Sequence, residues 1–119
     1  LLSEILMQKG YHVVVVDHFE KRLDKVNGEH FVHKSLMETF KLVKSAKLVI
    51  SNESFGAHLA GLLGTDCITL SGWLSPEVVN DMTKNNWIWN QETANPGRNL
   101  QLITVDHVLS KMDEMNIKP

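Results

Sequence analysis

The stretch KLVISNESFGAHLAGLLGTDCITL, residues 47–70, decides the fold of this chain. Two short apolar runs, at 48–50 and 67–70, flank a segment of helical character from Phe55 to Leu63, and the polar residues 51–54 precede that segment. This order of strand, turn, helix and strand predicts a compact βαβ unit with parallel strands. The helix begins with unpaired backbone N–H groups and the positive end of its dipole, so its start suits an anion, phosphate above all.

Helices and strands also alternate in the residues before this stretch. The β-branched run from His12 to Val16 is typical of a strand buried on both faces of a parallel sheet. Ser35 followed by Glu38 is the capping-box pattern of a helix start. The first expected element is a helix that carries Leu2, Ile5 and Leu6 and is ended by Gly10, and the strand 12–16 follows it. Next come a helix that carries Phe19, Leu23 and Val26 and is ended by Gly28, and a strand from His30 to Val32. The last is a helix with Leu36, Phe40 and Val43 on its buried face.

The residues after the stretch continue the alternation. Gly64 closes the central helix, Pro76 fits the first position of another helix, and Trp87 to Trp89 can form a strand. Thr104 is expected to cap a last helix, whose apolar face carries Val105, Val108, Leu109 and Met112. Strands alternating with helices predict an α/β fold with an open parallel sheet, helices on both sides, and a ligand at the carboxyl ends of the strands.

Composition narrows the class of protein. With 119 residues, 43% of them hydrophobic, and a net charge of −2, we expect one domain, residues 1–119, and no nucleic-acid partner, which would require clustered basic residues. The lone Cys67 lies in a predicted buried strand and has no intrachain partner, which fits a reducing cytoplasm. Six scattered histidines and one cysteine indicate no metal site. Leu1 is not an initiator methionine and falls within a predicted helix, so we expect a piece excised from a longer protein.

Residues 51–60, SNESFGAHLA, followed by Leu63-Gly64-Thr65, resemble the signature N-D-[ST]-G-P-x-H-L-A…L-G-T-P of glycosyltransferase family 9, the ADP-heptose:lipopolysaccharide heptosyltransferases. The family aspartate, glycine and proline are replaced here by Glu53, Phe55 and Gly56. The resemblance extends over nearly the whole chain. It implies a Rossmann-like three-layer α/β/α domain, the C-terminal, donor-binding half of a two-domain GT-B enzyme.

In that family the diphosphate of a nucleotide-sugar lies at the start of the central helix. The resemblance implies that backbone N–H groups of Ser54, Phe55 and Gly56 donate to it and stabilise charge on the leaving phosphate. It also implies that Glu53 accepts hydrogen bonds from sugar hydroxyls and that His58 lies near the phosphates or holds the loop.

Two residues outside the central motif are further candidates for donor binding. Glu20 follows a strand end and is expected to bind the ribose hydroxyls. Trp73 also follows a strand end and is expected to lie against the base or the sugar.

Four of these residues also have a purely structural interpretation. Ser54 can be a plain N-cap, and Glu53 a favourable acidic residue at a helix N-terminus. His58 can be a half-buried histidine with satisfied hydrogen bonds, and Glu20 a solvated acid in the first turn of a helix.

The resemblance implies an inverting transfer of a sugar, heptose in this family, from an ADP-sugar to a lipopolysaccharide-type acceptor, without metal or cofactor. The general base would belong to a missing N-terminal acceptor domain, so no catalytic residue is assigned here and the isolated piece is expected to be inactive. Such an enzyme would be cytoplasmic and peripheral at the inner membrane.

Two other interpretations stay open. One is a degenerate, non-catalytic GT-B-like module used for assembly or partner binding, which the Phe55-Gly56 replacement favours. The other is a nucleotide-sugar epimerase-like GT-B half. A receiver domain is disfavoured, because its phospho-acceptor aspartate and paired acids are missing at the strand ends.

Overall fold

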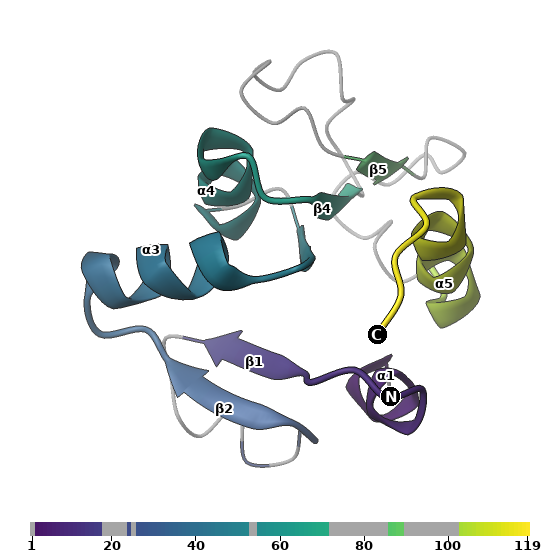
Figure 1. Cartoon of the computed structure of the whole chain (residues 1–119), viewed down its shortest axis with the longest axis horizontal. Helices are drawn as coiled ribbons and strands as arrows, with labels where there is room; N and C mark the ends of the chain where they lie inside the picture. The colour runs from purple at the N-terminus through teal and green to yellow at the C-terminus, as the bar shows by residue number, and fades with distance from the viewer. Residues whose placement is uncertain (1, 18–23, 25, 53–54, 72–85, 90–102) are drawn as a thin grey trace, which may run out of the picture. The chain divides into compact units, whose positions relative to one another are not determined.

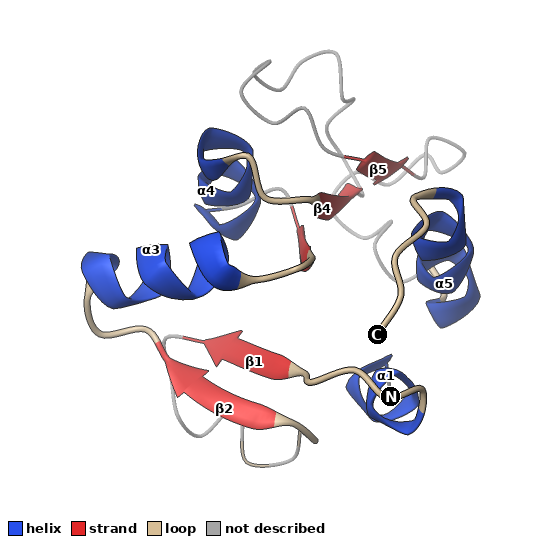
Figure 2. Ribbon diagram, viewed as in Figure 1, coloured by secondary structure: helices blue, strands red, loops and turns tan. Residues whose placement is uncertain are grey.

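The computed structural model describes residues 2–17, 24, 26–52, 55–71, 86–89 and 103–119. Over these ranges helices and strands alternate, and every pair of neighbouring strands is parallel (Figures 1 and 2). The chain is therefore a compact α/β domain with small parallel sheets, as the alternation of patterns predicts. The chain divides into two compact units, residues 1–39 with 118–119, and residues 40–117.

The first unit contains a two-stranded sheet. Helix α1 (Leu2–Gln8) buries Leu6 and is followed by Gly10, whose φ of +99° is the left-handed conformation expected of a helix-ending glycine. Strand β1 (Val14–Asp17) pairs in parallel with β2 (Glu29–Val32), with Val15 opposite His30. The strands predicted at 12–16 and 30–32 are confirmed within two residues.

One expectation for β1 is wrong. Its residues were expected to be buried on both faces, yet Val16 is 45% exposed and Val14 and Val15 are only partly buried. Among the described strands β1 pairs only with β2, and a two-stranded sheet has too little surface to enclose a strand.

Helix α3 (Leu36–Ser45) begins where the capping pattern predicts. The Glu38 backbone N–H donates to the Ser35 hydroxyl at 3.2 Å, which satisfies one of the free N–H groups of the first turn. Thr39 and Val43 are buried and Phe40 is partly buried, so the predicted face is largely confirmed. Leu36 is the exception at 60% exposed, because it is the first residue of the helix and lies beyond the end of the buried stripe.

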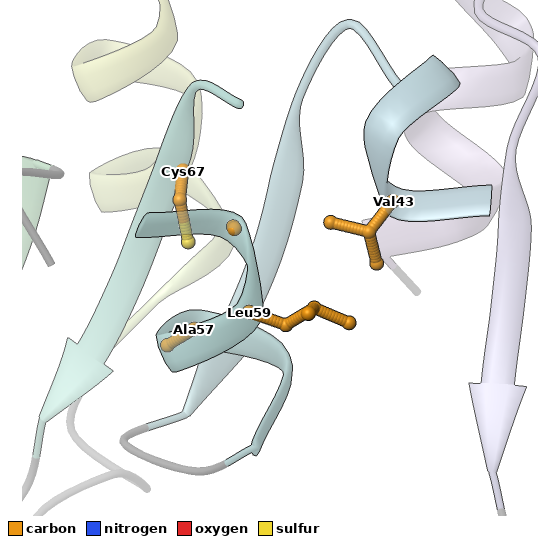
Figure 3. Close-up of a cluster of buried hydrophobic side chains, with 5 residues drawn as sticks. Val43, Ala57, Leu59 and Cys67 are labelled. Atoms are coloured by element: carbon orange, nitrogen blue, oxygen red, sulfur yellow. The ribbon is translucent and has the colours of Figure 1, made fainter. Parts of the chain in front are cut away.

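The second unit is built on the stretch at 47–70. Strand β3 (Val49–Asn52), helix α4 (Phe55–Leu63) and strand β4 (Cys67–Ser71) form the predicted βαβ unit, and β5 (Asn86–Trp89) extends the sheet in the order β3-β4-β5. Helix α5 (Val105–Glu114) packs against β5 and buries Val108 and Met112. Helices α4 and α5 lie on opposite sides of this sheet (Figures 1 and 3).

The core of the second unit lies between α4, the end of α3 and the first strands of the sheet. Figure 3 shows Val43, Ala57, Leu59 and Cys67 converging there, and Ala60 belongs to the same cluster. Cys67 is fully buried, as its place in an apolar strand predicts. The helices expected at 19–26 and from Pro76 fall largely or wholly outside the described residues.

Candidate functional site

The candidate site is the start of α4, at the edge of the sheet where β3 and β4 end. The register places Ser51 opposite Thr69 and Asn52 opposite Leu70, so both strands finish at the same edge. Phe55 is the first residue of α4, three positions after the last residue of β3. The backbone N–H groups of the first turn of a helix have no partner within the helix. In α4 this first turn comes directly after the carboxyl edge of the sheet.

Gly56 allows α4 to approach β3 closely. A Cβ atom built on Gly56 would lie 3.1 Å from Ser51 Oγ and 3.6 Å from Ser51 Cβ, the first of which is tighter than an ordinary van der Waals contact. The Ser51 hydroxyl donates to the Asn52 carbonyl at 2.9 Å and so is held in this place. Gly56 therefore has a packing role in the βαβ unit, in addition to any role towards a ligand.

The first turn of α4 presents two of the predicted residues to solvent. Phe55 is 45% exposed, and His58, on the next position of the outer face, is also exposed. The inner face of the helix carries Ala57, Leu59 and Ala60, all buried. His58 therefore lies on the solvent side of α4, since the sheet side is filled by small and branched apolar residues.

Charge is scarce on this helix. Apart from His58, α4 contains no side chain that can carry a charge near neutral pH. An anion at its start would therefore be held by backbone N–H groups and by His58, without help from a lysine or arginine of α4.

Phe55, Gly56 and His58 are thus brought together in one helical turn. The other four predicted residues, Glu53, Ser54, Glu20 and Trp73, lie outside the residues that the structure describes, and their roles stay predictions.

Ser51 is the residue that sequence reasoning missed as a site candidate. Its contact with Gly56 depends on the distance between strand and helix, and the residue pattern gave no signal of it.

The end of α4 explains part of the sequence signature without any ligand. Gly64 adopts a φ of +73°, which a glycine tolerates better than other residues, and so ends the helix. The Thr65 hydroxyl donates to the Val43 carbonyl at 3.0 Å, and the Thr65 N–H to the Ala60 carbonyl at 3.0 Å. The Leu-Gly-Thr segment therefore fixes the turn into β4 and ties it to α3.

Within the described residues, no group of three or more His, Cys, Asp and Glu side chains is placed to hold a metal ion. In the same part of the chain, no helix is long and apolar enough to cross a bilayer.

Comparisons of the chain with protein families, with curated proteins and with solved structures gave no match. The resemblance to glycosyltransferase family 9 therefore depends on the quoted residues alone.

Proposed function

We propose that this chain is the donor-binding domain of an inverting glycosyltransferase similar to family 9. In this proposal the domain is Rossmann-like, with three layers, and forms the C-terminal half of a GT-B enzyme. The whole enzyme would transfer a sugar, heptose by resemblance, from an ADP-sugar to a lipopolysaccharide-type acceptor at the cytoplasmic side of the inner membrane. The observation that carries the proposal is the parallel β3–α4–β4 unit, with α4 starting at the carboxyl edge of the strands.

The chemistry asked of this domain is to hold a diphosphate and to stabilise it as a leaving group. Donors fixed before the reaction stabilise the charge that grows on the phosphate in the transition state. The first-turn N–H groups of α4, with Phe55 and Gly56 among them, and the exposed His58 ring support this role. In the proposal Glu53 and Ser54 complete the phosphate and sugar contacts, and Glu20 and Trp73 receive the nucleoside.

Titration of ADP, an ADP-sugar and UDP into ¹⁵N-labelled protein tests this proposal. We expect backbone amide shifts centred on residues 54–58, larger for ADP than for UDP. The His58→Ala variant should weaken binding, whereas Leu62→Ala should leave it unchanged, because Leu62 lies on the same helix and is 64% exposed. Shifts centred elsewhere, or equal effects of the two variants, would contradict the proposed site.

The two-domain account is tested by a transfer assay with the isolated chain. We expect no turnover, because the general base would come from the N-terminal acceptor domain. Substantial turnover by the 119-residue chain would overturn this account.

A second candidate, a degenerate module that no longer binds a donor, is favoured by one observation. Phe55 stands where the family has glycine, and this residue is 45% exposed at the start of α4, where a phosphate would have to approach the backbone. Restoring the glycine with Phe55→Gly separates the two candidates. ADP binding that appears only in this variant supports the degenerate module, and ADP binding by the natural chain supports the donor domain.

A further inference from the structure

The N-terminus of α5 carries a capping box in which a histidine replaces the usual glutamate or glutamine. The Thr104 hydroxyl accepts from the His107 backbone N–H at 3.2 Å, and the Thr104 backbone N–H donates to His107 Nδ1 at 3.1 Å. Both halves of the reciprocal arrangement are therefore present. Sequence reasoning predicted Thr104 as the cap but not the partner of its N–H group.

The second of these hydrogen bonds requires His107 to accept at Nδ1. A backbone N–H can only donate, so Nδ1 must be the acceptor and must carry no proton. The ring is then neutral, with its proton on Nε2. Protonation of Nδ1 would place two donors opposite each other, and it would add positive charge at the positive end of the helix dipole.

We infer that α5 contains an acid-sensitive cap: protonation of His107 breaks its bond to Thr104 and loosens the first turn of the helix. The bond from the His107 N–H to the Thr104 hydroxyl does not involve the ring and remains, but the first backbone bond of the turn, from the Val108 N–H to the Thr104 carbonyl, is long at 3.4 Å. Val108 is 2% exposed, so loosening the turn reaches a core residue of the second unit.

Among the residues that the structure describes, the charged neighbours of His107 along the chain lie on α5. On α5 itself, Asp106 precedes it and Lys111 follows one turn later, where the ammonium group pairs with Glu114 at 3.0 Å. Strand β5, against which α5 packs, contains no residue that titrates. The neighbouring Asp106 carboxylate is the group whose own titration must be separated from that of His107.

Two other histidines of the described residues, His12 and His30, do not share this sensitivity. His12 Nε2 donates to a Glu29 carboxylate oxygen at 2.7 Å, and His30 Nε2 donates to the Val26 carbonyl at 2.6 Å. Both bonds use the histidine as donor, so a protonated ring keeps them. Acid therefore acts on α5 and spares these contacts of the first unit.

The test follows the Thr104 amide and the His107 ring by NMR in the 119-residue chain between pH 8 and pH 5, the range in which histidine side chains take up a proton. We expect the neutral ring to carry its proton on Nε2, and the Thr104 amide shift to change with the same midpoint as the ring. Exchange of this amide, corrected for its intrinsic pH dependence, should rise about five-fold, the equivalent of about 1 kcal/mol for one lost hydrogen bond.

Two variants separate the cause. His107→Gln keeps an acceptor that does not titrate, so the response of Thr104 should disappear while α5 stays capped. Asp106→Asn removes the neighbouring carboxylate, and the response should persist. A neutral ring protonated on Nδ1, a Thr104 amide that ignores the titration, or an unchanged response in His107→Gln would each overturn the inference.

Discussion

Replacing Gly56 by alanine should change stability in a way that depends on residue 51. Alanine in a helix is favoured over glycine by about 0.5–1 kcal/mol, because glycine loses more backbone freedom on folding. The new Cβ would lie 3.1 Å from Ser51 Oγ, however, so the Ser51 side chain or the helix must shift by a few tenths of an ångström. Overpacking of this kind costs about 1–3 kcal/mol. In the natural chain we therefore expect Gly56→Ala to be neutral or destabilising by up to about 2 kcal/mol.

Removing the Ser51 hydroxyl oxygen should make the Gly56→Ala substitution stabilising. In a Ser51→Ala background the closest remaining atom is the Cβ of residue 51, at the ordinary contact distance of 3.6 Å. Gly56→Ala should then stabilise by about 0.5–1 kcal/mol, so the coupling between the two sites should be about 1 kcal/mol or more. Both proteins that carry Ser51→Ala lose the bond from Ser51 to the Asn52 carbonyl, so this loss cancels in the double-mutant cycle.

The assay is urea unfolding of the four proteins, followed by circular dichroism and analysed by linear extrapolation. A Gly56→Ala effect that is equal in both backgrounds, to within about 0.5 kcal/mol, would refute the argument that Ser51 sets the approach of α4 to β3.

Three further predictions concern the same unit. Leu59→Ala should destabilise the protein by about 2–5 kcal/mol in urea unfolding, because this side chain fills the core. Leu62→Ala, on the exposed face, should change stability by no more than about 0.5 kcal/mol. Similar values for both variants would contradict the assignment of the two faces. Gly64→Ala should cost about 1 kcal/mol of stability and Gly64→Asn less, because the space around Gly64 is open and only its φ of +73° is unfavourable for other residues. If thermal unfolding shows the asparagine variant to be less stable than the alanine variant, this cause is wrong. Cys67 is fully buried, so a thiol reagent should label it only as fast as the protein opens, and rapid labelling of the native chain would show that the β4 core is accessible.

Much of the fold was predictable because its signals are local. Ser35 and Thr104 start their helices and Gly10 and Gly64 end theirs, each through bonds or dihedrals within a few residues. The strands on either side of α4 were recognisable as short apolar runs bounded by polar residues. Even the strand at 86–89 has the expected aromatic and β-branched pattern.

The candidate site was less predictable. The motif directed attention to α4, but the contact between Ser51 and Gly56 depends on the distance between a strand and a helix, which no residue pattern states. The exposure of His58 likewise depends on which face of α4 the sheet covers. His107 escaped notice because its ring replaces the carboxylate or amide of the usual capping box.

The sequence by itself determined the order, type and approximate ends of the helices and strands around residues 47–70, because periodicity, caps and glycine dihedrals act over a single turn or strand. Only the tertiary structure decided that Val16 and Leu36 stay exposed, that Thr39 is buried with its hydroxyl bonded to the His33 ring, and that the described strands pair as a two-stranded and a three-stranded sheet. Burial and strand pairing depend on segments far apart in the chain coming into contact, and a local pattern carries no information about those contacts.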